Sequence, residues 1–288
     1  RIDALDARIQ ALIGERAEIA LKVARIKQAQ GRSDFYRPER EAEVLRRVAE
    51  RNAGPLDDAT LTRLMREVMS ACLALESPLK VAYLGPEGTY TQAAVYRHFG
   101  HAVDALPRAA IDEIFREVEA GNADFGVVPV ENSTEGVVSH TLDQLVGSSL
   151  RICGEVALGV HHHLLSKAAD ITGVKRVVAH AQSLAQCRKW LDRHLPGVVR
   201  EAVSSNGEAA RRVAGESQAA AIAGRAASEF YELPILASNI EDEPNNTTRF
   251  LVLGKQQVPA TGNDMTSILV AIRNQPGMLH RLLTPGAE

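Results

Sequence analysis

The N-terminal segment carries one apolar stripe at helical spacing, with a charged residue set into it. Its side chains recur three or four residues apart, as on a helix that packs in a coiled coil, and they are Ile2, Leu5, Ile9, Leu12, Ile19, Val23 and Ile26. Arg16 fills the one longer gap. At about 1.5 Å per residue, a helix that continues to Gln30 is roughly 45 Å long, too long for a small helical domain to cover. We expect a helix of a second subunit to cover the stripe.

Two further helices are predicted before residue 78. Pro38 stands at the first position of a helix that runs to about Arg51. Asp57 or Asp58 can cap a third helix, which continues to Glu76. Residues 1–77 are therefore predicted to form an all-α domain of three helices.

From residue 80 the pattern changes to short apolar runs that alternate with helical stretches. The runs predicted as strands are 81–84, 125–130, 177–178, 219–222 and 249–253. The predicted helices are 91–99, 111–120, 184–195 and 225–231. Such alternation is typical of a mainly parallel sheet with helices on its faces, whose ligands bind at the carboxyl ends of strands. We predict an α/β domain over 80–255, with one lobe at 80–158 plus 236–255, a second at 159–235, and a cleft between them.

A third unit begins after a polar linker, over residues 265–288. Residues 267–272 are predicted as a strand, and Pro276-Gly277 opens a helix. The sequence stops soon afterwards, and it starts within a helical pattern without Met. We therefore expect the chain to be a fragment.

Composition and charge argue against several classes of protein. The chain has 33 Lys and Arg against 36 Asp and Glu, a formal charge of −3, and 4% aromatic residues. Nucleic-acid-binding surfaces are usually clearly basic and often use aromatic stacking, so no nucleic-acid partner is expected. No apolar run reaches the roughly 18 residues of a membrane span, so no membrane partner is expected either. Three scattered cysteines without a CxxC pair indicate reduced thiols and a cytoplasmic location.

Three consecutive histidines raise the question of a metal site. On a strand, His161 and His163 share one face and His162 points away. No cysteine or further histidine stands at ligand spacing. A polar patch on a strand is the favoured interpretation, and neither a metal nor a cofactor is expected.

Cations on the helices are predicted to face inward. Arg16 lies in the apolar stripe, and Lys27 follows eleven residues later, so both point the same way about 16 Å apart. Arg40 shares a stripe with apolar residues of the second helix, and Glu76 ends the third. The cations leave room for one small polycarboxylate between them. The alternative is a salt-bridge network across a helical dimer.

Three polar loops follow apolar runs where a cleft would lie. Residues 84–91, LGPEGTYT, form a glycine turn before a helix, whose free N–H groups could hold a carboxylate; the alternative is a structural turn. Residues 128–136, VPVENSTEG, follow a buried strand; the alternative is a helix cap by Ser133 or Thr134. Residues 245–250, NNTTRF, place an arginine at the mouth of a strand; the alternative is a turn with an edge cation.

Residues 1–27, followed by YRPERE at 36–41 and LMREVMSACLALE at 64–76, resemble the all-helical chorismate mutase family. The resemblance implies a domain-swapped dimer that rearranges chorismate to prephenate. It implies that Arg16 and Arg40 bind the substrate's carboxylates. It further implies that Lys27 donates to the ether oxygen and that Glu41 receives the ring hydroxyl.

Two features depart from this family. An arginine expected two residues before Arg1, which reaches into the neighbouring site, is absent from the sequence. Glu76, assigned a catalytic role, stands where many members have Gln. A carboxyl group can donate a hydrogen bond to the ether oxygen only when it is protonated. We therefore expect a mutase that favours mildly acidic pH.

The segments GPEGTYTQAA, VPVENSTEG and NNTTRF, in this order, resemble the prephenate dehydratase family over residues 80–254, and AHAQSLAQC at 179–187 resembles a further loop of that family. The resemblance implies two lobes shaped like a periplasmic binding protein. It also implies conversion of prephenate to phenylpyruvate with loss of CO2 and water. Thr248 is implied as proton donor or orienter and Arg249 as carboxylate clamp. The other implied pocket residues are Thr89, Glu131, Asn132, Ser133, Asn246 and Phe250.

Residues 266–283, TSILVAIRNQPGMLHRLL, resemble the start of an ACT regulatory domain. The resemblance implies that Gly277, Met278 and Leu279 belong to a turn that binds phenylalanine at a dimer interface. Inhibition by phenylalanine is expected only if the full domain is present.

The favoured interpretation is a bifunctional enzyme of phenylalanine biosynthesis, a homodimer or higher oligomer that acts on chorismate and then prephenate. One alternative is a dehydratase whose helical domain only dimerises. The other is a non-catalytic module that binds a small carboxylate.

Overall fold

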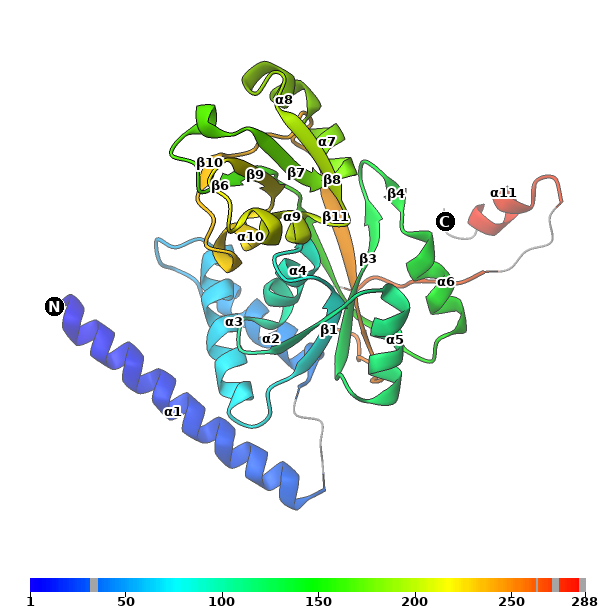
Figure 1. Ribbon diagram of the computed structural model, residues 1–288. Coiled ribbons are helices and arrows are strands. Elements are labelled where there is room, and N and C mark those ends of the chain that lie inside the picture. Colours follow the sequence, from blue (N-terminus) through cyan, green and yellow to red (C-terminus); the bar gives the residue numbers. More distant parts are fainter. Residues whose placement is uncertain (32–35, 263, 271–274, 285–288) are drawn as a thin grey trace.

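The computed structural model describes residues 1–31, 36–262, 264–270 and 275–284. Three helices come first in the chain (Figure 1): α1 Ile2–Ala29, α2 Pro38–Glu50 and α3 Asp58–Ala74. As predicted, Pro38 opens α2, and the Asp57 carboxylate caps α3 by accepting from the N–H of Thr60 at 2.6 Å.

Helix α1 contacts α3, but most of its length projects from the rest of the chain (Figure 1). Helices α2 and α3 pack against each other, and α3 also contacts the α/β part. The apolar stripe of α1 is exposed: Ile2 keeps 72% and Leu12 62% of its accessible surface. Ala24 is the one buried residue of this helix. The described part of the chain therefore leaves most of the stripe uncovered.

The first of two sheets has the strand order β2-β1-β3-β11-β5, with β4 paired to β3. Its strands are β1 Lys80–Leu84, β2 Asp104–Arg108, β3 Phe125–Asn132, β4 Gly136–Val137, β5 Arg151–Gly159 and β11 Thr247–Gly254. Helix α4, Tyr90–Phe99, packs on one face. Helices α5, Ile111–Ala120, and α6, Ser139–Gly147, pack on the other.

The second sheet has the order β10-β6-β9-β7-β8. Its strands are β6 His163–Ser166, β7 Arg176–His180, β8 Val199–Val203, β9 Ala219–Ala223 and β10 Ile235–Ala237. Its helices are α7 Ala181–Gln186, α8 Arg188–His194, α9 Asn206–Val213 and α10 Arg225–Phe230, and a 3-10 turn covers Ile171–Gly173. Apolar clusters on its two faces form the core of this lobe.

The sheets are mixed, whereas a mainly parallel sheet was expected. Strand β11 runs antiparallel to both β3 and β5, and β6 runs antiparallel to β9. The chain re-enters the first sheet from the second lobe, and this return brings β11 in against the direction of its neighbours.

Two predicted boundaries also differ from the structure. The sequence assigned residues 236–255 to the first lobe, but β10 pairs with β6, so residues 236 and 237 lie in the second sheet. The helix expected over 184–195 is broken at Cys187, which ends α7 and precedes α8.

The helical part and the first lobe share a core. Tyr36 lies in the same cluster as residues of α4 and β3, with ring centroids 5.5 Å from Phe99 and 5.3 Å from Phe125. A Cβ at Gly100, whose φ is +77°, would lie 2.5 Å from the Cβ of Ser70 in α3. Only glycine allows the turn after α4 to approach α3 this closely.

The C-terminal residues match the expectation in part. Helix α11, Met278–Leu283, follows Pro276-Gly277 as predicted. Of the strand predicted over 267–272, residues 267–270 are not in a strand, and 271 and 272 lie outside the described residues. A strand needs a paired neighbour, and the structure pairs none with 267–270. Among the described helices, none is both long and apolar enough for a bilayer crossing.

Candidate active sites

Five side chains predicted to act together line one cavity of about 300 Å³ between the three helices. Helix α1 contributes two cations eleven residues apart, α2 a cation and a carboxylate, and the turn after α3 a second carboxylate. The five are Arg16, Lys27, Arg40, Glu41 and Glu76. We call this space the helical cavity. Its wall also includes Phe99 from the α/β part, so the first lobe closes one side of it.

Glu41 is held between an arginine and a tyrosine. The Nε of Arg66 donates to its Oε1 at 3.2 Å, and Glu41 also has a hydrogen bond to the buried Tyr36. Burial raises the pKa of the Glu41 carboxyl, and Arg66 opposes that rise. A carboxylate in this setting can accept a hydrogen bond from a ligand hydroxyl.

Glu76 faces the helical cavity near Lys27. Burial raises the pKa of its carboxyl, and the charge of Lys27 acts in the opposite direction. The protonated form therefore persists to higher pH than for an ordinary glutamate. This is the form that can donate a hydrogen bond into the cavity.

A hydrogen-bonded cluster lies at one end of the first sheet, where the end of β3 pairs with the start of β11. The Nδ2 of Asn132 donates to the Thr248 hydroxyl and to the Oδ1 of Asn246, both at 2.8 Å. The Ser133 hydroxyl accepts from the N–H of Thr247 at 2.9 Å and donates to the carbonyl of Asn245. Because the Thr248 hydroxyl accepts from Asn132, its own proton can be donated to a ligand.

This cluster continues across the cleft to the second lobe through Gln186. The Oε1 of Gln186 accepts from the Nδ2 of Asn246 at 3.5 Å and lies 2.7 Å from the Nε2 of His162. The Nε2 of Gln186 donates to Glu135 of the first lobe at 3.4 Å. On its other side, the Nδ1 of His162 lies 3.2 Å from the Tyr90 hydroxyl. Burial lowers the pKa of His162, which favours the neutral ring in this chain.

Thr89 lies at the start of α4 in the first lobe. Its hydroxyl caps α4 and also donates to the carbonyls of Leu84 and Pro86. With Tyr90, Leu158 and His161 it lines a cavity of about 270 Å³, which we call the cleft cavity. Leu158 is the β5 neighbour of Thr248, so its side chain lies beside that of Thr248 on the same face of the sheet.

Arg249 does not join this cluster. Its guanidinium makes two hydrogen bonds to Glu155, at 2.9 and 2.8 Å, and one to Glu131 at 2.6 Å. The hydrogen bonds to Glu155 and Glu131 raise the pKa of the Arg249 guanidinium above its usual value. The guanidinium that was expected to bind the substrate is therefore bonded to carboxylates of β3 and β5. Phe250 is buried in the core beneath and does not reach the cleft.

The three histidines do not form a strand patch. His161 and His162 precede β6, and the Nδ1 of His161 lies 2.9 Å from Glu241. His163 is buried in β6, and its Nδ1 accepts from the N–H of Asn239 at 3.2 Å. Within the described residues, no group of three metal-ligating side chains comes together.

Sequence reasoning missed Gln186, His162 and Tyr90 as parts of the cleft. Gln186 belongs to the segment AHAQSLAQC, whose resemblance marked the loop but not the residue. His162 and Tyr90 had no such signal, because their role depends on how the two lobes meet. In the turn that the sequence resemblance assigned to an ACT domain, Gly277 has φ +80° before α11, and Met278 is half-buried. The side chain of Leu279 lies outside what the structure describes.

Two family models match the chain. The model of chorismate mutase type II matches residues 1–77, and that of prephenate dehydratase matches residues 81–258. The first covers the three helices and the second both sheets.

Relatives with both activities in their names match nearly the whole chain. The bifunctional chorismate mutase/prephenate dehydratases of Stutzerimonas stutzeri and Pseudomonas aeruginosa are each 59% identical over 290 aligned residues, which cover 99% of this chain and 80% of theirs. A crystal structure of prephenate dehydratase from Arthrobacter aurescens in complex with L-Phe is 30% identical, with a TM-score of 0.62. It covers 72% of this chain and 71% of its own. The expected fold, a helical region followed by a two-lobed α/β domain, is thereby confirmed.

Proposed function

The chain belongs to the family of bifunctional chorismate mutase/prephenate dehydratases, and we propose that it performs two consecutive steps of phenylalanine biosynthesis. Residues 1–77 rearrange chorismate to prephenate, and residues 80–255 convert prephenate to phenylpyruvate. The observation that carries the proposal is the convergence of Arg16, Lys27 and Arg40 on one cavity with two glutamates.

The first step needs no nucleophile, because a pericyclic rearrangement breaks the C–O bond as it forms a C–C bond. The enzyme has to hold a compact conformer and stabilise charge on the ether oxygen. Arg16 and Arg40 bind the two carboxylates, and Lys27 and protonated Glu76 donate to the ether oxygen. Glu41 accepts from the ring hydroxyl.

The second step removes the ring hydroxyl and a carboxylate together. The C–C bond to that carboxylate breaks, CO2 leaves, and the electron pair completes the aromatic ring as water departs. Thr248 delivers or orients the proton that the hydroxyl needs, and Asn132 and Asn246 hold Thr248 in place. Thr89, Ser133 and Gln186 complete the pocket between the lobes.

We propose a different role for Arg249 from the one the resemblance implied. The Arg249 guanidinium bonds both Glu131 of β3 and Glu155 of β5, so it holds β11, which carries Thr248, in place between these two strands. Arg249 is then a positioning residue rather than a substrate clamp.

We further propose that the enzyme is a homodimer in which a partner's helix covers the exposed stripe of α1. Residues 265–288 are proposed as the start of an ACT domain, with phenylalanine as the ligand of the turn at Gly277, Met278 and Leu279. The L-Phe complex of the related dehydratase supports that ligand. The free thiols of Cys72, Cys153 and Cys187 fit a cytoplasmic location.

Following chorismate loss and phenylpyruvate formation by absorbance, each from its own substrate, tests the proposal. We expect both reactions. Dehydration without chorismate loss would favour the reading in which the helices only dimerise. Binding of prephenate without turnover would favour the non-catalytic module.

A further inference from the structure

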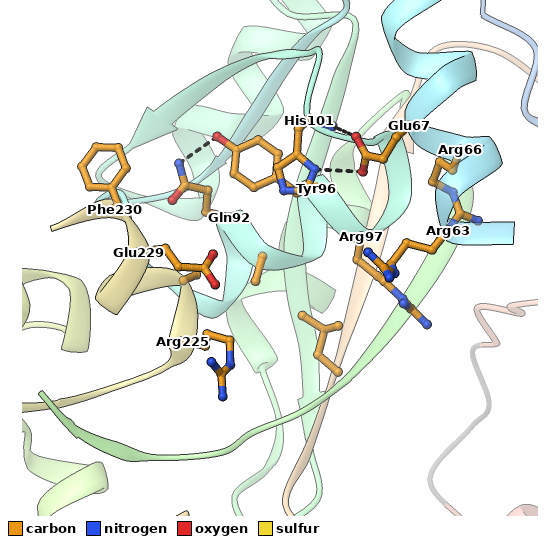
Figure 2. Close-up of a pocket in the computed structure, with 13 residues that line it drawn as sticks. Arg63, Arg66, Glu67, Gln92, Tyr96, Arg97, His101, Arg225, Glu229 and Phe230 are labelled. Atoms are coloured by element: carbon orange, nitrogen blue, oxygen red, sulfur yellow. Dashed lines mark hydrogen bonds and ion pairs between the residues drawn. The ribbon is translucent and has the colours of Figure 1, made fainter. Parts of the chain in front are cut away.

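A further cavity lies beside the two sites described above. It measures about 480 Å³ and lies between α3, α4 and α10 (Figure 2). We call it the arginine cavity, because four guanidinium groups line it against two carboxylates. The charged side chains are Arg63, Arg66, Arg97, Arg225, Glu67 and Glu229.

Three of these arginines are available to a ligand. Within the part of the chain that the structure describes, Arg63, Arg97 and Arg225 have no carboxylate within ion-pair distance, and all three are exposed. Glu67, in contrast, is engaged: its two oxygens bond the ring and the backbone N–H of His101, at 2.8 and 3.0 Å. The balance of charge in the cavity therefore favours an anion.

The remaining wall is apolar and aromatic. Tyr96 stacks on the ring of His101 at a centroid distance of 4.7 Å, and its hydroxyl accepts from Gln92. Phe230 from α10 stands on the far side of the cavity in Figure 2 and is half exposed, and Leu158 closes the wall. A guanidinium group can bind one carboxylate through two parallel hydrogen bonds, and flat apolar walls favour a ring. The ligand class is a small cyclic dicarboxylate.

The cavity stands between the two proposed active sites. On one side, Arg66 lines it and donates to Glu41, which lines the helical cavity. On the other side, it shares four residues with the cleft cavity: Ala93, Leu158, Arg225 and Ala226. Leu158 is the strand neighbour of Thr248. A continuous row of lining residues thus joins Glu41 to the cleft.

We propose that the arginine cavity is a holding site for the dicarboxylate that leaves the helical cavity, and that it passes this intermediate to the cleft. The inference rests on the proposed function and adds a path to it. An excess of one sign of charge in a cavity concentrates oppositely charged molecules, and salt weakens this effect. A share of the intermediate formed by the mutase then reaches Thr248 before it mixes with the solution.

Isotope dilution tests this path in the full chain. The protein receives radiolabelled chorismate together with a pool of unlabelled prephenate. We expect the first phenylpyruvate formed to carry about tenfold more label per molecule than the free prephenate pool, the lower end of what charge focusing supports. In the double variant Arg63→Gln/Arg97→Gln, the product should carry the label of the pool. Each half-reaction, measured alone, should keep its wild-type rate.

The matched control is Arg116→Gln/Arg193→Gln, which removes two exposed helical arginines that do not line the cavity and should keep the enrichment. Raising the salt concentration with the wild type should abolish the enrichment too. Equal label in product and pool for the wild type would overturn the holding site while both half-reactions persist. Enrichment that survives the double variant or high salt would also overturn it. Loss of a half-reaction in the wild type would instead refute the proposed function itself.

Discussion

Thr248 and Arg249 are neighbours in β11, yet their side chains lie on opposite faces of the first sheet. The Thr248 hydroxyl accepts from Asn132 beside the cleft, whereas the Arg249 guanidinium bonds Glu131 and Glu155. The residues that follow keep this alternation: Phe250 packs with α4, and Leu251 packs with α5. The two residues therefore act in different ways.

Replacing Thr248 with alanine should remove the proposed proton donor and leave the binding of prephenate nearly unchanged. Groups that transfer or orient a proton contribute about 100-fold or more to turnover, so kcat for dehydration should fall by at least about that factor. Thr248→Ser should recover much of it. The neighbour variant Thr247→Ala is the control, and stopped-flow or steady-state assays on prephenate give the values. Wild-type turnover in Thr248→Ala would make this hydroxyl structural.

Arg249→Lys should weaken the fold more than it weakens substrate binding. A lysine cannot make the forked bond to Glu155 and reach Glu131 as well. The guanidinium is partly exposed, so we expect a loss of only about 1 kcal/mol in unfolding free energy. The KM for prephenate should change less than about twofold. Thermal unfolding and steady-state kinetics together decide, and a KM raised about tenfold, a difference of about 1.4 kcal/mol, would return Arg249 to the role of substrate clamp.

Glu76 should make the mutase step depend on pH. In the proposed role, only the protonated form of Glu76 can donate to the ether oxygen. Because burial raises the pKa of this carboxyl, activity should be present at low pH and fall as the pH rises through that pKa. Glu76→Gln donates at every pH and should flatten the profile of kcat/KM for chorismate. Glu50→Gln, on an exposed carboxylate of α2, should leave the profile as in the wild type. A slope that persists in Glu76→Gln would assign it to another group.

Gln186 should matter to dehydration alone. Gln186→Leu keeps the volume of the side chain but breaks its bonds to His162, Asn246 and Glu135 across the cleft. Unpaired polar groups cost about 1–3 kcal/mol each, so kcat/KM for prephenate should fall about tenfold while chorismate turnover stays constant. Gln218→Leu, an exposed glutamine of the same lobe, serves as the control. An equal loss of both activities would point to general damage to the fold.

The helices and their cavity could be predicted because the information is local. The eleven-residue spacing of Arg16 and Lys27 fixes their common direction, and Pro38 and Asp57 mark where helices begin. Such signals need only a few neighbouring residues, and helix geometry supplies the rest.

The cleft needed the tertiary structure. Glu155, which engages Arg249, lies 94 residues away on a strand that no periodic pattern marked. Gln186 meets Asn246 only because the two lobes come together. Sequence resemblance linked the three loops to one site, but strand alternation decided that Thr248 bonds Asn132 on one face of the sheet and Arg249 bonds Glu155 on the other.

Tyr36 belongs to the helical part by sequence and to the first lobe by packing, where it touches Phe99 and Phe125. Cutting the chain at residue 78 would separate Tyr36 from the first lobe and expose Phe99 and Phe125 to water. Side-chain packing therefore joins the two parts in addition to the covalent link near residue 78, and on heating they should unfold in a single transition.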